Sequence, residues 1–162
     1  MNLYIFRHGM TYFAKNNIPY GDQVESAEIL EEGIPTIKKL GEYLKDIKTE
    51  VNYTSPFKRC IQTSGIVSEI TNKKFEVDGK LRDWDPRHET VEEMIERLLS
   101  FCRNIENTNH NSLSICTHGY PINALIAYFT KREIKVEDLD NYPNPGVLTM
   151  IAEGKVNYKD FN

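Results

Sequence analysis

Residues 3–9, LYIFRHG, decide the fold, and the sequence repeats their pattern at residues 113–119, LSICTHG. Each is a short apolar run, typical of a buried strand, followed by one polar residue and then His-Gly. In open α/β sheets, ligands bind beyond the carboxyl ends of the strands. If the two strands are neighbours, His8 and His118 face one pocket. The glycine after each histidine lets the backbone come close to a ligand.

The chain around these two runs alternates between helical and extended patterns. Apolar residues at three- and four-residue spacing predict helices over about residues 30–47, 55–71, 91–105 and 122–129. Apolar runs predict further strands at residues 51–54, 74–77, 147–152 and 156–158, and a hairpin turn joins the last two. Residues 10–29 and 78–89 are expected to be loops.

This alternation predicts one α/β domain over residues 1–162. We expect a three-layer sandwich with a mostly parallel central sheet flanked by helices, and an antiparallel edge formed by the C-terminal hairpin. The order of the strands stays open.

Composition narrows the class of protein. The 162 residues carry a formal net charge of -4, which disfavours a nucleic-acid partner. No stretch reaches the roughly 20 apolar residues of a membrane helix, and the N-terminus does not resemble a signal peptide. Three cysteines, an odd number without metal-site spacing, favour reduced thiols and a cytoplasmic location.

Two arginines lie at the same predicted sheet edge as the histidines. Arg7 precedes His8, and Arg59 falls in the first turn of a helix that follows a strand. Several cationic and imidazole groups at one edge of a sheet repel one another, which costs free energy unless an anion binds between them. A phosphoryl group suits them, because planar guanidinium groups match its oxygens in bidentate fashion.

Several short motifs follow one another in the order seen in a known family. They are RHGMT at 7–11, LEEG at 30–33, SPFKRCIQT at 55–63, LRD at 81–83, ET at 89–90 with Arg97, and THG at 117–119. This order resembles the histidine phosphatase (phosphoglycerate mutase-like) superfamily, branch 1, and the length resembles its short phosphatase members. The resemblance covers most of the chain.

The resemblance implies a mechanism. His8 is the expected nucleophile, transiently phosphorylated, while Arg7, Arg59 and His118 hold the phosphoryl oxygens and Asp83 is the general acid. The other groups expected to bind substrate are Thr11, Glu89 and Gly119. No metal and no cofactor are expected, because fixed cations neutralise the phosphate.

The sequence leaves the identity of the general acid open. The family acid is usually glutamate, so the shorter Asp83 has two rivals, Asp85 and Glu89, and an aspartate in a loop is often only a turn former. Cys116 is interpreted as a buried, inert thiol. The segment between Asp83 and His118 leaves no chain for a lid, so we expect an open site.

The leading function is hydrolysis of a small phosphorylated metabolite, whose identity the sequence does not give. The alternatives are a phosphatase acting on phosphohistidine in proteins, a phosphoglycerate mutase, and a non-catalytic phosphate-binding module. Expected partners are the small substrate alone, without nucleic acid or membrane, and a homodimer is left open.

Overall fold

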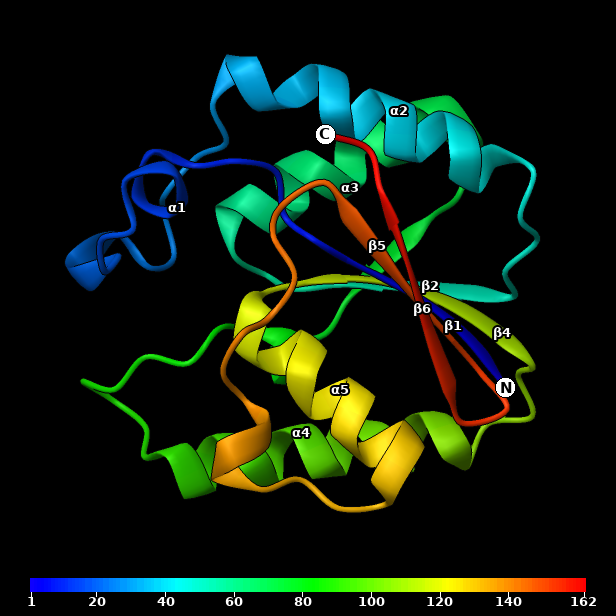
Figure 1. The fold of residues 1–162 in the computed structure, drawn as a ribbon. Helices are drawn as coiled ribbons and strands as arrows, with labels where there is room; N and C mark the ends of the chain where they lie inside the picture. Colours follow the sequence, from blue (N-terminus) through cyan, green and yellow to red (C-terminus); the bar gives the residue numbers. More distant parts are fainter.

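The computed structural model describes residues 1–162 as one α/β domain whose central sheet lies between two layers of helices (Figure 1). The six strands are β1 (Asn2–Arg7), β2 (Val51–Thr54), β3 (Phe75–Val77), β4 (Ser112–Thr117), β5 (Val147–Ala152) and β6 (Lys155–Asp160). The α-helices are α1 (Tyr12–Asn16), α2 (Ile34–Lys45), α3 (Lys58–Thr71), α4 (Val91–Glu106) and α5 (Gly119–Lys131). Short 3₁₀ turns lie at Gly21–Gln23, Glu31–Gly33, Gly79–Leu81 and Val136–Asp138.

The strand order is β3-β2-β4-β1-β5-β6. The first four of these are parallel to one another, whereas β5 is antiparallel to β1 and to β6. The predicted three-layer sandwich with an antiparallel edge is therefore confirmed. The hairpin turns at Glu153 and Gly154, which both adopt positive φ, as a two-residue turn between strands requires.

Each face of the sheet packs against its own pair of helices. Leu3 and Ile5 of β1 belong to a buried cluster with residues of α4 and α5, while Phe6 joins a second cluster with residues of α2 and α3. This alternation along β1 follows from the two-residue period of a strand. Figure 1 shows α2 and α3 above the sheet and α4 and α5 below it. None of the helices combines the length and apolar character that crossing a bilayer requires.

Three local predictions need correction. Residues 10–29 are not only loop, because Thr11 caps the short helix α1 by accepting a hydrogen bond from the Ala14 amide. Helix α3 begins at Lys58, not at Ser55, since the Ser55 amide still donates to Cys116 O of β4. Proline at position 56 also disfavours helical geometry at the residue before it. The final strand is longer than residues 156–158 at both ends.

Candidate active site

The two histidines lie side by side at the carboxyl end of the sheet. β1 and β4 are parallel neighbours, with Arg7 opposite Thr117, so His8 and His118 each follow the last paired residue. Their ring centroids are 5.3 Å apart, and both side chains are fully buried. The strand order, which the sequence leaves open, thus meets the condition under which the two imidazoles lie together.

The protonation state of His8 follows from one hydrogen bond. Its Nδ1 lies 2.8 Å from the carbonyl oxygen of Gly9, and a carbonyl can only accept, so Nδ1 carries the proton. In the neutral ring the other nitrogen, Nε2, then holds a free lone pair. Nε2 is buried and has no hydrogen-bond partner in the protein. That is the arrangement a nucleophilic imidazole needs.

Two guanidinium groups, those of Arg7 and Arg59, lie close enough to His8 to lower its pKa. Arg59, from the first turn of α3, is fully buried and donates to Val24 O and, across 2.9 Å, to Asp83 Oδ2. Arg7 donates to Pro143 O at 3.5 Å and packs 4.9 Å from the centre of the Tyr142 ring. The Nε atoms of both arginines are buried without a partner, as is His8 Nε2. Three unpartnered buried nitrogens in one small region are unusual, because buried polar atoms are normally paired.

His118 is oriented by a serine that precedes α3. Ser55 Oγ lies 2.7 Å from His118 Nε2 and accepts a hydrogen bond from the Phe57 amide. The serine hydroxyl can therefore donate to Nε2, which leaves the ring proton on Nδ1. That atom faces Asp83 Oδ2 at 3.7 Å. Sequence patterns do not indicate this role for Ser55, because the contact joins two segments far apart in the chain.

The pKa values of the titratable groups follow from burial and charge. Burial, reinforced by the Arg7 and Arg59 charges, holds the pKa of His8 well below its ordinary value of 6.5. The pKa of His118 is lowered well below 6.5 by burial and then by Arg59. Burial raises the pKa of Asp83 above 3.8 despite the nearby arginines. The site therefore pairs neutral imidazoles with a carboxyl group that is easier to protonate than usual.

The structure separates the three carboxylates considered for the acid. Asp83 contacts Arg59 and His118 and lines the cavity described below. Asp85 also lines the cavity, but Arg87 binds it in bidentate fashion, and these hydrogen bonds lower the pKa of Asp85 to about 2. Glu89 is not among the cavity-lining residues; Arg97 and Arg82 hold its carboxylate at 2.7 Å and 3.0 Å.

The two remaining expected binding residues lie in different settings. Gly119 opens α5 and lines the cavity, and a Cβ there would lie 2.3 Å from a carbon of the Tyr142 ring. Only glycine fits at that position. Thr11 is buried, and its hydroxyl caps α1 and is 2.7 Å from the hydroxyl of Tyr20. Thr11 thus organises the segment beside the site rather than lining the cavity.

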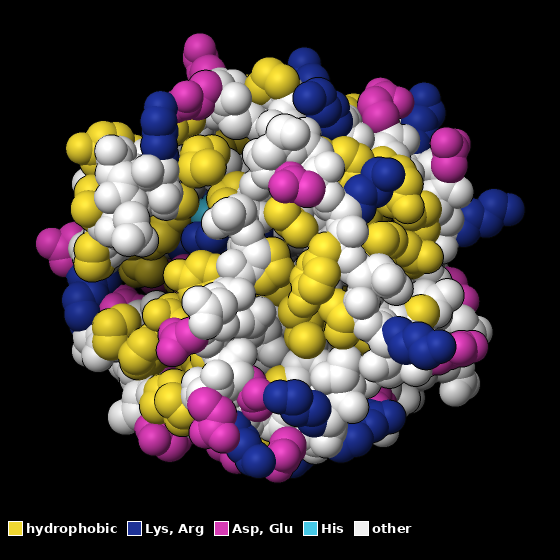
Figure 2. Space-filling model, in the orientation of Figure 1, with side chains coloured by type: hydrophobic (Ala, Val, Ile, Leu, Met, Phe, Trp, Pro, Cys, Tyr) yellow, Lys and Arg dark blue, Asp and Glu magenta, His cyan; other side chains and the backbone are white.

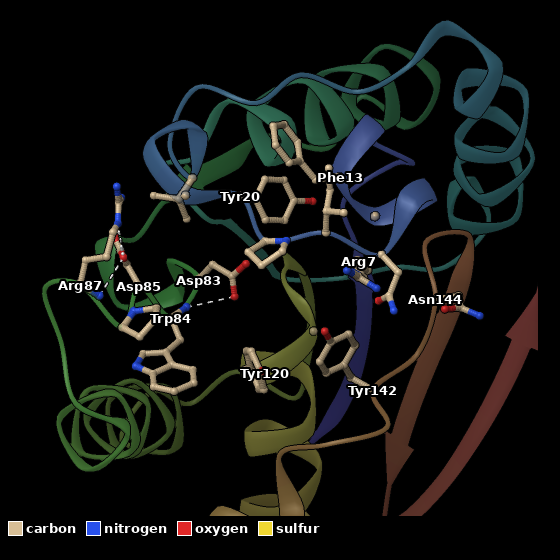
Figure 3. A pocket seen from close by; sticks show the side chains of 18 residues that line it. Arg7, Phe13, Tyr20, Asp83, Trp84, Asp85, Arg87, Tyr120, Tyr142 and Asn144 are labelled. Carbon is tan, nitrogen blue, oxygen red and sulfur yellow. Dashed lines mark hydrogen bonds and ion pairs between the residues drawn. The ribbon is translucent and has the colours of Figure 1, made fainter.

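A cavity of about 600 Å³ leads to these groups. Figure 2 shows the hollow on the left of the molecule, beside the segment that carries α1, with hydrophobic side chains around it and a basic side chain inside. Arg7 and Asp83 are on its wall, and Figure 3 shows them between aromatic residues contributed by separate segments. His8, Arg59 and His118 are not on the wall, because they are completely buried.

Tyr20 covers part of this region. Its ring lies 4.0 Å from the Arg59 guanidinium and 6.4 Å from the His8 ring. The segment between Asp83 and His118 is indeed occupied by α4 and β4. The expectation of an open site nevertheless needs correction, since the cover comes from the earlier segment that follows α1. No sequence pattern singles out Tyr20, because it lies in a stretch without periodicity.

The fold and the site define an α/β protein with paired histidines and arginines at the carboxyl end of a mostly parallel sheet. The family model described as the histidine phosphatase superfamily (branch 1) matches residues 3–88 and 82–154. The chain belongs to this superfamily.

Individual relatives are distant. A protein of Hydrogenobacter thermophilus named "Putative phosphoserine phosphatase 2" is 23% identical over 188 residues, covering 94% of this chain and 90% of the relative. The alpha-ribazole phosphatase from Shigella flexneri has a similar fold, with a TM-score of 0.78, 18% identity, and coverage of 99% and 95% of the two chains. The protein histidine phosphatase SixA in complex with tungstate gives a TM-score of 0.68 at 18% identity, covering 98% and 94%. At these identities the solved structures share the fold.

Proposed function

We propose that this protein hydrolyses phosphomonoesters of small metabolites through a phosphohistidine on His8. The observation that carries the proposal is the set of three buried, unpartnered nitrogens: Arg7 Nε, His8 Nε2 and Arg59 Nε. The two arginine nitrogens are hydrogen-bond donors, and the histidine nitrogen carries a lone pair. This set suits a phosphoryl group, whose oxygens accept hydrogen bonds and whose phosphorus accepts an electron pair. The charges of Arg7 and Arg59 are close enough to lower the pKa of His8.

The first step forms the phosphohistidine. The lone pair of His8 Nε2 attacks phosphorus in line, the bond from phosphorus to the ester oxygen breaks, and Asp83 gives its proton to the departing oxygen. The alcohol leaves, and Gly9 O stabilises the ring, now positively charged, through the Nδ1 proton. Arg7, Arg59 and His118 donate to the phosphoryl oxygens, where charge spreads in a loose transition state.

The second step releases phosphate. Water attacks phosphorus, the Asp83 carboxylate accepts a proton from that water, and the bond between phosphorus and Nε2 breaks with its electrons returning to His8. Each group ends in its starting state. The role of Asp83 in both steps agrees with its raised pKa, which makes the protonated form more accessible.

No metal is required in this scheme. Two guanidinium groups and two imidazole rings supply the donors that neutralise the phosphoryl oxygens. No three His, Cys, Asp or Glu side chains converge in the chain as metal ligands would.

Two features favour a small alcohol as the leaving group over a phosphohistidine side chain of a protein. Asp83 is placed beside Arg59 and His118, and an acid at that position is needed for an alkoxide but not for an imidazole, which leaves readily. The reacting groups also lie behind a cavity and beneath Tyr20, a setting that admits small molecules more readily than a protein surface. The Tyr20 ring over the site is not enough for mutase activity. A mutase must also hold the dephosphorylated product until the phosphoryl group is returned to it.

The direct test is to trap the intermediate. Brief incubation with a ³²P-labelled phosphomonoester followed by alkaline quench should leave acid-labile phosphate on the peptide that contains His8, as found by mass spectrometry. His8→Ala should abolish both the label and turnover. The matched control is His110→Ala, a half-buried histidine that precedes β4 at the opposite end of that strand. Full turnover by His8→Ala, or equal labelling of both variants, contradicts the proposal.

A further inference from the structure

The cavity is larger than the reaction itself requires. Its volume of about 600 Å³ lies in the range of roughly 300–1,000 Å³ that is typical of sites for organic ligands of several rings. The phosphoryl group would be held at its inner end by groups that do not line the cavity, chiefly His8, Arg59 and His118. Most of the volume is therefore available to the leaving group.

Aromatic side chains form two separate clusters on the cavity wall. Phe13 and Tyr20 stack with ring centroids 4.8 Å apart and an angle of 32°. Tyr120 is at the centre of the second cluster, with edge contacts to Trp84 at 5.5 Å and to Tyr142 at 5.2 Å. All five are half-buried and line the cavity. Figure 3 shows the two clusters on opposite sides of Arg7 and Asp83.

The cavity lacks a cation for a second anionic group. Only two lining residues are basic, Arg7 and Arg87. Arg87 is neutralised, because it donates to both carboxylate oxygens of Asp85, at 2.9 Å and 2.7 Å, and to Asp22 at 2.5 Å. Arg7 is beside His8 and is needed for the phosphoryl group. A carboxylate or second phosphate on the substrate would meet Asp83 and Asp85 without a free counter-charge, which is unfavourable.

We infer that the substrate is a phosphomonoester of an uncharged alcohol bearing a planar aromatic ring, held between the Phe13–Tyr20 pair and the Tyr120 cluster. This inference rests on the proposed phosphatase function. Aromatic rings favour stacked or edge contacts with other rings beyond what their area alone provides. A nucleoside and a simple aryl-alkyl alcohol share this chemistry, and only the nucleoside adds a sugar that fills more of the volume.

The test compares four substrates by kcat/KM for phosphate release: 2-phenylethyl phosphate, 2-cyclohexylethyl phosphate, adenosine 5′-monophosphate and phosphoserine. The phenyl ester should exceed its saturated, size-matched counterpart by about threefold to tenfold, the magnitude expected for one aromatic contact. Phosphoserine, with a charged and non-aromatic leaving group, should be the poorest. A higher value for adenosine 5′-monophosphate than for the phenyl ester identifies a nucleoside-type alcohol, and the reverse order identifies a simple aryl alcohol.

A set of variants tests whether the aromatic wall of the cavity causes the preference for the phenyl ester. Tyr120 has no hydrogen bond from its hydroxyl to another side chain or to the backbone, so Tyr120→Phe should keep the phenyl-over-cyclohexyl ratio, whereas Tyr120→Leu should bring it close to one. Tyr12→Leu is the control, since Tyr12 is 58% exposed and does not line the cavity. The ratio should be unchanged in that variant.

The outcomes separate this inference from the proposed function. Acetyl phosphate, which is small, activated and not aromatic, should label His8 whatever the cavity prefers. Labelling of His8 together with equal kcat/KM for the phenyl and cyclohexyl esters, or with phosphoserine as the best substrate, overturns the aromatic inference alone. Absence of any His8-dependent phosphate release overturns both.

Discussion

Arg59 Nη2 and Asp83 Oδ2 form an ion pair at 2.9 Å in which the arginine is fully buried and the aspartate is 14% exposed. The same carboxylate oxygen lies 3.7 Å from His118 Nδ1. The carboxylate thus contacts two groups that would hold a phosphoryl oxygen. We expect a phosphate dianion to displace it from Arg59, and the dianion's charge then raises the pKa of Asp83 further. Substrate binding would in this way prepare the acid that the reaction needs.

Replacing Asp83 should harm difficult leaving groups most. Asp83→Asn cannot donate a proton, so kcat for an alkyl phosphate should fall by about 10²–10⁴-fold, whereas nitrophenyl phosphate, whose leaving group needs little protonation, should lose far less. Steady-state release of phosphate from both substrates measures this. The control is Asp85→Asn, because the low pKa of Asp85 keeps it ionised near neutral pH. If Asp85→Asn shows the selective loss and Asp83→Asn does not, Asp83 is not the acid.

The two site histidines should stay neutral in mildly acidic solution. Their pKa values are lowered by burial, so ¹⁵N NMR signals of His8 and His118 should change at a lower pH than a free histidine, whose pKa is near 6.5. Because the unfolded chain binds protons below pH 6.5 that the folded chain does not, the free energy of unfolding should decrease as pH falls through that value. Urea unfolding at pH 7 and pH 5.5 checks the sign. Protonation of both rings at or above pH 6.5 contradicts the structure.

Removing the Tyr20 ring should expose His8, the proposed nucleophile. Tyr20 packs on Arg59 and lies beside His8, whose Nε2 is buried. Diethyl pyrocarbonate attacks neutral imidazole nitrogen, so Tyr20→Ala should increase the rate at which His8 is modified several-fold, measured by peptide mass spectrometry. Tyr12→Ala, at an exposed position on α1, should leave the rate unchanged. Equal rates in both variants would mean that Tyr20 does not control access.

Glu89 should prove more important for stability than for substrate. Its carboxylate binds Arg97, and both side chains are only 9% exposed, so Glu89→Ala leaves a largely buried guanidinium without its partner. We expect a loss of about 3 kcal/mol in the free energy of unfolding, at the lower end of values for broken buried pairs. Glu96→Ala, on the exposed side of α4, should cost less than about 0.5 kcal/mol. A large rise in KM with unchanged stability would instead support the substrate-binding role expected from sequence.

Chelation should leave activity intact. If guanidinium and imidazole groups alone neutralise the phosphoryl oxygens, dialysis against EDTA should not change kcat/KM, and vanadate should inhibit by adopting the geometry of the transition state. The rate of phosphate release before and after chelation measures the first effect. If chelation abolishes activity and a divalent ion restores it, the reaction needs a metal ion and the proposed metal-free mechanism is wrong.

Sequence patterns predicted most of the fold because its core elements are strongly periodic. The strand–Arg/Thr–His–Gly repeat located β1 and β4, and the apolar spacing located α2, α4 and α5. Helix α1 was missed, since five residues are too few to show a period, and its cap by Thr11 is a local hydrogen bond. The start of α3 was placed too early, because the Ser55 side chain binds His118 instead of capping a helix.

The site residues that belong to sequence motifs could be predicted. The residues that join the site through contacts between distant segments could not. His8, His118, Arg7 and Arg59 sit at strand ends or at the start of a helix, and topology brings such positions together. Tyr20 and Tyr142 come from irregular segments, and their contacts with Arg59 and Arg7 depend on how those segments pack. The spacing of residues along the sequence does not predict such contacts.

The register of Arg7 with Thr117 also has a consequence for how the molecule becomes functional. These partners are among the first and the last residues of the parallel core, so the intervening chain must be closed into a loop before the two imidazoles can meet. Pairings of such high contact order form slowly compared with local helices. During synthesis on the ribosome, the chain up to β3 can already contain α2 and α3, together with Arg7, His8 and Arg59, but it lacks His118, the fourth group proposed to bind the phosphoryl group. Recovery of catalysis on refolding should therefore lag behind recovery of helical circular dichroism.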